Sequence, residues 1–152
     1  MNPPDKNDFR DGLQSLETFL ETPRVSGQLE RWIADVQSNV ELIDSLLPKQ
    51  IERHHAARLR QIAAEEPELN AEVERIKSGD DETRAQFDKL RERTCRLTKK
   101  ATRIEPDESR LEEQLSDLTT QGLAFIIHAR KQEIAIETWQ HEAVYRETGG
   151  SG

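Results

Sequence analysis

The apolar residues between Pro106 and Tyr145 repeat every seven positions, in alternating steps of four and three. This repeat is typical of a long helix that buries one seam against neighbouring helices. The seam turns polar near its middle, where His128, Gln132 and Glu133 follow a fully apolar run. The seam positions are Leu111, Leu115, Leu118, Gly122, Phe125, Ala129, Gln132, Ile136, Trp139 and Ala143. The reason for the polar interruption is the main question about function.

Composition agrees with long helices. Hydrophobic residues make up 34% of the 152 residues and charged residues another 34%, which suits amphipathic helices with solvated outer faces. No stretch alternates apolar and polar residues for long, so no sheet is expected. The sequence therefore predicts an all-α fold.

Two proline corners organise the rest of the chain. Glu-Pro-Glu at Pro67 and Glu-Pro-Asp at Pro106 each suit the start of a helix. Two tight corners joining three long segments predict an antiparallel up-down helical bundle, with a short N-terminal helix as a fourth member. We expect a single domain over residues 1–147 and a flexible tail over residues 148–152. The expected helices cover residues 8–20, 27–65, 67–104 and 106–145.

Two positions interrupt the long helices. The seam steps from Leu47 to Leu59 are all fours, and the change begins at Pro48. The helix either kinks or breaks there, and a kink is favoured because no turn-forming residue lies beside the proline. Gly79 is a second weak point, where the next helix either continues or breaks with Ser78 as a cap.

The apolar run from Leu123 to Ile127 covers more of its helix than one seam requires. The N-terminal helix is the expected cover. A homodimer contact along the same run is the competing explanation.

The polar interruptions of the three long helices fall at one level. Counted from the two corners, Asp80 is level with His54 and with residues near 130. Buried imidazoles and carboxylates must be paired or bind a cation. The predicted layer contains His54, His55, Arg58, Asp80, Asp81, Thr83, Arg84, His128, Gln132 and Glu133.

Three arrangements of this layer are consistent with the sequence. The first is a metal held by histidine nitrogens and carboxylate oxygens. The second is a metal-free network in which Arg58 and Arg84 neutralise Asp80, Asp81 and Glu133. The third is an ordinary solvated face.

The segment from His128 to Glu133 is similar to the His-x-x-x-Glu-Glu segment of hemerythrin-like (HHE) cation-binding domains. The His54-His55 pair and the helix from Ile76 to Leu90 resemble two more of the family's ligand-bearing segments. The resemblance implies a variant of the hemerythrin four-helix bundle. Its metal would be iron or manganese, and its implied ligands are His54, His55, Asp81, His128 and Glu133.

Members of the family bind a pair of irons and use it in dioxygen binding, sensing or iron handling. Here Asp81 stands where a histidine is expected, and Gln132 stands where the first carboxylate is expected. These departures indicate a degenerate or remodelled site, so we expect no cofactor, with iron or manganese as the alternative. The function that follows is a non-enzymatic binding or regulatory module. The alternative is a structural or adaptor bundle that acts through its surface or by dimerising.

Charge and motifs narrow the function classes further. A net charge of −8 disfavours nucleic acid as a partner. No secretory signal or membrane-spanning run is found, so a soluble, cytoplasmic protein is expected, as a monomer or homodimer with an unknown protein partner. Cys95 is the only cysteine, which excludes an internal disulfide. No phosphate loop, nucleophile elbow or HExxH pattern indicates an enzyme.

Overall fold

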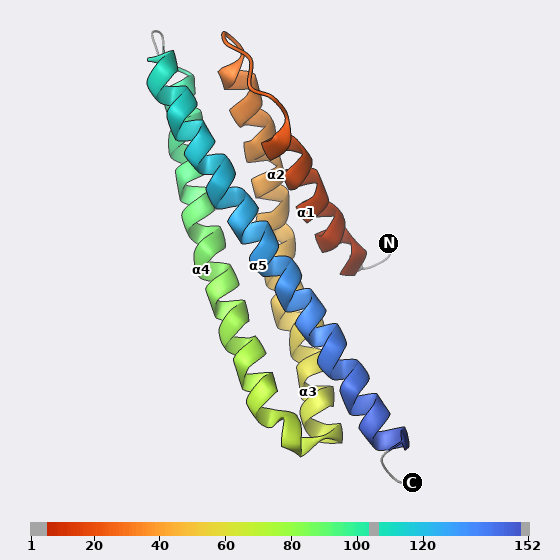
Figure 1. Cartoon of the computed structure of the whole chain (residues 1–152). Coiled ribbons are helices and arrows are strands. Elements are labelled where there is room, and N and C mark those ends of the chain that lie inside the picture. Colours follow the sequence, from red (N-terminus) through yellow and green to blue (C-terminus); the bar gives the residue numbers. More distant parts are fainter. Residues whose placement is uncertain (1–5, 104–106, 150–152) are drawn as a thin grey trace.

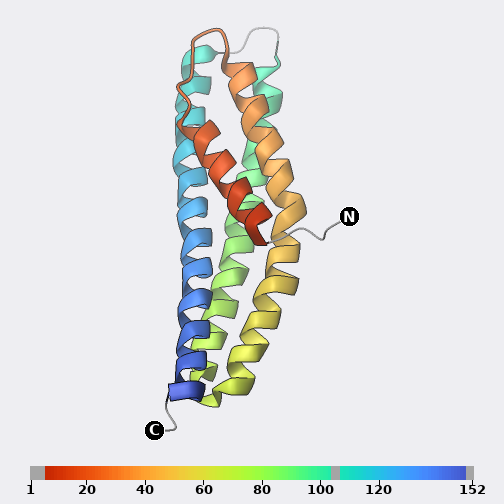
Figure 2. The same cartoon turned by 90° about the vertical axis from the view of Figure 1, so that its right-hand side faces the viewer.

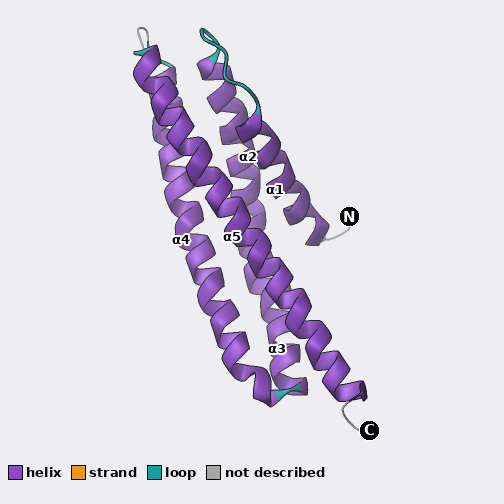
Figure 3. Ribbon diagram, in the orientation of Figure 1, coloured by secondary structure: helices purple, strands orange, loops and turns teal. Residues whose placement is uncertain are grey.

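A computed structural model describes residues 6–103 and 107–149. Every element in these two ranges is helical, and the prediction of an all-α bundle is confirmed (Figure 3). The elements are α1 (Lys6–Glu21), α2 (Leu29–Lys49), the π-helix η1 (Gln50–His55), α3 (Ala56–Glu65), the 3₁₀-helix η2 (Pro67–Leu69), α4 (Asn70–Ala101) and α5 (Glu108–Gly149). The last helix thus continues through residue 149, two residues into the tail predicted as flexible. Residues 150–152 of that tail lie outside the described part.

The long helices lie side by side. α2, η1 and α3 follow one another as one rod, α4 returns beside them, and α5 runs the full length of the bundle (Figure 1). The short helix α1 lies against α2 and α5 and covers only one half of the bundle (Figure 2). The half without α1 is therefore built from three helices.

The helix continues past Pro48 because the residues that follow form the π-helical segment η1, which fits the irregular spacing of the apolar residues. A π-helix turn holds more residues than an α-helical turn, so it accommodates the successive steps of four. Leu47, His55 and Leu59 are consequently buried on one side of the rod. The predicted irregularity is present as a π-helical segment, and the helix does not break. At Gly79 the alternative of a break is wrong, because α4 is continuous from Asn70 to Ala101.

Two apolar clusters form the core, and the polar layer lies between them. The larger cluster joins α1, α2, α4 and α5, and in α5 it ends at Ala129. The smaller cluster joins α3, η2, α4 and α5, and in α5 it begins at Ile136. The segment of α5 between these two residues carries Gln132 and Glu133. The sequence therefore placed the polar level correctly.

The N-terminal helix covers the apolar run of α5 in part. Phe125 and Ile126 are buried in the same cluster as the apolar side of α1. Leu20 of α1 lies directly over Gly122, where a Cβ would come within 2.5 Å of its Cδ1. Ile127 remains 54% exposed, so α1 does not cover this end of the apolar run.

Candidate functional site at the centre of the bundle

His55 is the centre of the polar layer. Its side chain leaves the π-helix η1 and is only 2% exposed. The ring nitrogen Nδ1 lies 3.0 Å from both carboxylate oxygens of Asp80 in α4. The other nitrogen, Nε2, lies 2.5 Å from Oε1 of Glu133 in α5. The imidazole therefore joins three helices, with a carboxylate against each of its nitrogens.

This geometry favours the doubly protonated ring. Burial by itself lowers the pKa of His55, but the hydrogen bonds to Asp80 and Glu133 and the charges of both carboxylates raise it to about 9. Burial by itself raises the pKa of Glu133, but the hydrogen bond and the charge of His55, the hydrogen bond from Gln50 and the charge of Arg58 together lower it. At neutral pH the ring is an imidazolium that donates one hydrogen bond to each carboxylate.

Two glutamines complete the hydrogen bonds of the carboxylates. Gln50, which is itself buried, donates from Nε2 to Oε1 of Glu133 at 3.0 Å. Gln132 donates from Nε2 to Oδ1 of Asp80 at 3.0 Å and to the carbonyl oxygen of Ile76 at 2.8 Å. The two carboxylates thus accept hydrogen bonds from both His55 and a neighbouring amide, which lowers the energetic cost of burying them.

Gly79 makes room for this network. A Cβ at this position would lie 2.3 Å from Oε1 of Gln132, so only glycine allows the amide to reach the backbone of α4. His128 donates from Nε2 to the carbonyl oxygen of Gly79 at 3.0 Å, and Thr83 donates from Oγ1 to the same oxygen at 2.9 Å. The weak point read from the sequence is therefore a contact point between α4 and α5.

Of the five predicted metal ligands, the structure brings only His55 and Glu133 into contact. Asp81 is exposed, and the neighbouring Asp80 takes its place because one step along a helix turns a side chain by about 100°. His54 lies half-buried outside the contact, for the same reason. His128 bonds the backbone of α4 instead of a carboxylate.

The arginines do not neutralise this layer directly, contrary to the metal-free network expected from the sequence. Arg84 pairs with Glu52, with 3.1 Å between Nη2 and Oε1. Arg58 donates to Oε1 of Gln140 at 2.8 Å, and it acts on Glu133 only through its charge. The cation that neutralises Asp80 and Glu133 is His55.

One residue of the network, Gln50, was not singled out from the sequence. The signal for it was present, because a step of three from Leu47 along the seam arrives at Gln50. The run of steps of four instead predicts Ile51 as the next residue of the buried seam. From Leu47, a step of three leads to Gln50, and two steps of four lead to His55. Two possible continuations of a seam from one residue therefore indicate a π-helical segment, because its wider turn can bring residues of both series to the inside.

The donor set does not fit an iron or manganese ion. Such an ion needs several histidine and carboxylate lone pairs directed at one point. Here the ring of His55 lies between the two carboxylates, and both of its nitrogens point at oxygen atoms within hydrogen-bond distance. Across residues 6–103 and 107–149, no three His, Cys, Asp or Glu side chains converge as a set of metal ligands.

Comparison of the chain with protein-family models, with curated proteins and with solved structures finds no match. Within the described ranges, no helix has both the length and the apolar character that crossing a membrane requires.

Proposed function

We propose that this chain is an antiparallel helical bundle of hemerythrin-like type whose metal centre has been remodelled into a metal-free ion network. Its function on this proposal is that of a non-enzymatic binding or regulatory module. The observation that carries the proposal is the position of His55, whose imidazolium lies between Asp80 and Glu133. A protein side chain supplies the cation that the two carboxylates require.

The same contacts support binding over catalysis. His55 is the residue of the cluster best suited to proton transfer near neutral pH. Its ring is buried and both of its nitrogens are engaged with carboxylates, so no nitrogen is directed at a substrate. The network joins η1, α4 and α5, and its role in the proposal is to fix their register while the outer faces make the functional contacts.

Metal analysis tests the proposal. Freshly purified protein supplemented with iron or manganese, then desalted, is expected to carry far less than one metal ion per chain by inductively coupled plasma mass spectrometry. The melting temperature should be the same with either metal and with a chelator, since the part of the chain that the structure describes holds no ligand set through which a metal could stabilise the fold. Near-stoichiometric iron or manganese in the desalted protein would overturn the metal-free proposal.

His128→Leu provides the matched variant for the metal test. Its melting temperature should differ from wild type by the same amount with and without added metal, because among the described residues His128 bonds the carbonyl oxygen of Gly79 and no carboxylate. A destabilisation that occurs only in the presence of metal would identify His128 as a ligand.

A second candidate function, an adaptor that dimerises through α5, is favoured by a separate observation. The outer side of α5 carries exposed residues in steps of three and four, which is the spacing of a helix-pairing seam. Ile127 is 54% exposed, Ile134 is 61% exposed and Tyr145 is 70% exposed. These outer positions are Ala124, Ile127, Lys131, Ile134, Thr138, His141 and Tyr145.

The mass of the protein in solution tests the adaptor function. If the outer side of α5 pairs two copies, light scattering should give the dimer mass, and Ile134→Lys should return the protein to the monomer mass. Leu42→Lys is the control, since Leu42 is a comparably exposed aliphatic residue on α2. A monomer mass for the wild-type protein at all concentrations would remove the homodimer from consideration.

A further inference from the structure

Basic residues are concentrated in the second half of α4 and in the two residues that follow it. Residues 88–103 contain seven basic and two acidic side chains, a net charge of +5 in a chain whose total is −8. The remaining residues therefore carry −13. A segment of opposite sign within an acidic protein identifies a surface that attracts anions.

Part of this basic segment lines a groove between α4 and α5. The groove has a volume of about 620 Å³, in the range of small-molecule sites. Its α4 wall presents Lys89, Arg93, Arg96 and Lys100, which follow one another in steps of four, three and four. Such steps place the four side chains on one face of the helix, in a row about 16 Å long.

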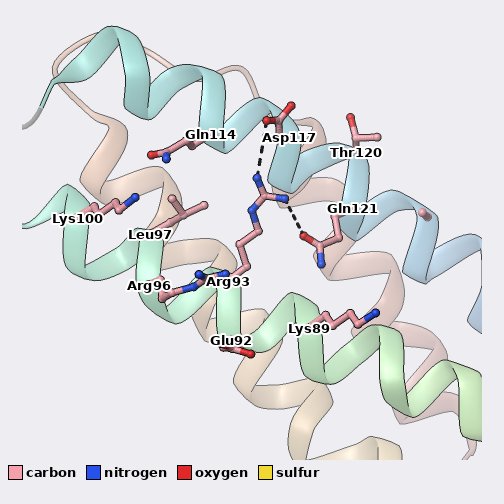
Figure 4. Close-up of a pocket in the computed structure, with 11 residues that line it drawn as sticks. Lys89, Glu92, Arg93, Arg96, Leu97, Lys100, Gln114, Asp117, Thr120 and Gln121 are labelled. Atoms are coloured by element: carbon pink, nitrogen blue, oxygen red, sulfur yellow. Dashed lines mark hydrogen bonds and ion pairs between the residues drawn. The ribbon is translucent and has the colours of Figure 1, made fainter.

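The opposite wall of the groove is supplied by α5. Gln114, Asp117, Thr120 and Gln121 line the groove on this side, and Figure 4 shows Asp117 and Gln121 directed at Arg93 of the basic row. Arg93 donates from Nη1 to Oε1 of Gln121 at 3.2 Å, and its Nη2 lies 3.8 Å from Oδ2 of Asp117. Its guanidinium is therefore already held in the groove before any ligand arrives.

The other three cations of the row have no such partner. Among the described residues, Lys89, Arg96 and Lys100 form no ion pair with a carboxylate, although Glu92 and Asp117 also line the groove. The carbonyl end of α4 accounts for Lys100, because the helix dipole favours cations in the last turn. This effect falls off within one turn and does not explain Lys89 and Arg96.

We infer that the groove binds a linear, multiply charged anion made of linked phosphate groups, such as the phosphate chain of a nucleoside triphosphate or a free polyphosphate. A row of cations about 16 Å long suits a chain of charges better than a single one. Arginine adds paired donors for phosphate oxygens, and the amides of Gln114 and Gln121 add neutral donors. The carboxylates of Glu92 and Asp117 and the net charge of −8 disfavour a nucleic-acid duplex.

Isothermal titration calorimetry at low ionic strength, with magnesium absent, tests the inference. Tripolyphosphate and ATP should bind at about one per chain, and inorganic phosphate should bind at least about tenfold more weakly because it meets fewer cations. Equal affinity for ATP and tripolyphosphate would identify the phosphate chain alone as the ligand, whereas tighter binding of ATP would add the nucleoside. Absence of binding, or preferential binding of a DNA duplex, would overturn the inference.

A pair of charge-matched variants separates the groove from general attraction. Arg96→Gln with Lys100→Gln should weaken tripolyphosphate binding by about tenfold or more. Lys99→Gln with Arg103→Gln removes the same charge from the same end of α4, outside the groove lining, and should change affinity by no more than about twofold. Equal losses in the two variants would refute a built site. The outcome is independent of the His55 centre, since no residue of that centre lines the groove.

Discussion

Replacing His55 with leucine is expected to lower the free energy of unfolding by about 3 to 5 kcal/mol. The substitution removes the cation between Asp80 and Glu133 and leaves two carboxylates without their shared partner. Asp80 is only 4% exposed, so water does not readily replace the lost contact. Urea unfolding followed by circular dichroism at pH 6 measures the loss.

Two controls distinguish the lost cation from the loss of a packed ring. The triple variant His55→Leu, Asp80→Asn, Glu133→Gln removes the charges together with the cation, and it should recover most of the stability lost in the single variant. His54→Leu changes the neighbouring histidine, which lies outside the contact, and should have an effect within about 0.5 kcal/mol. A loss for His55→Leu no larger than that for His54→Leu would show that the network does not stabilise the fold.

The level of the polar layer could be predicted because helix geometry converts sequence distance into height. The corners predicted at Pro67 and near Pro106 set two origins, and counting from them placed His54, Asp80 and the region near residue 130 together; residues 104–106 themselves lie outside the described part of the chain. The contacts of Asp80 with His55 and with Gln132 agree with that count. A rise of 1.5 Å per residue makes this kind of estimate tolerant of an error of one residue.

The identity of the contacting side chains was less predictable, because rotation about a helix does not tolerate such an error. The expected ligands included Asp81, and the inward residue is Asp80. In η1 the wider π-helical turn shifts the register, so that Gln50 and His55 both face inward. The shifted register in η1 makes His55 the cation that neutralises the carboxylates. The arginines predicted for that role, Arg58 and Arg84, bond to other partners.

The glycines show a further limit of sequence reasoning. Gly79 resembled a helix break, since glycine weakens a helix interior by about 1 kcal/mol. In the structure its missing side chain is the space that Gln132 occupies. The sequence shows that Gly79 is unfavourable within a helix. It does not show why glycine is needed there, because the residue that needs the space, Gln132, lies on another helix.

Stability is expected to fall as the pH rises from about 6.5 to about 9. The pKa of His55 is about 9 in the folded chain, against an ordinary value of 6.5. The native state therefore holds more protons than the unfolded state between these pH values, and raising the pH favours unfolding. The stabilisation from His55 is fully present below pH 6.5, and its loss across this window amounts to about 3 kcal/mol.

At the acidic limit Glu133 has the opposite effect. Its pKa is lowered in the folded chain, so its contribution is present above about pH 4.5 and is lost as the pH falls further. Groups from four elements act on this pair of residues. They are Asp80 of α4, Gln50 of η1, Arg58 of α3 and the partners His55 and Glu133 themselves. Together these contributions place the most stable range between about pH 4.5 and pH 6.5.

Urea unfolding at intervals from pH 5 to pH 9.5 measures the slope, and NMR of the His55 ring nitrogens assigns the titration to that residue. The triple variant that lacks His55 and both carboxylates should be nearly flat between pH 6.5 and pH 9. Equal slopes in the wild type and this variant would assign the alkaline loss to other groups. A His55 ring that titrates near 6.5 in the folded protein would show that the carboxylates do not hold its proton, and the ion network would then be absent at neutral pH.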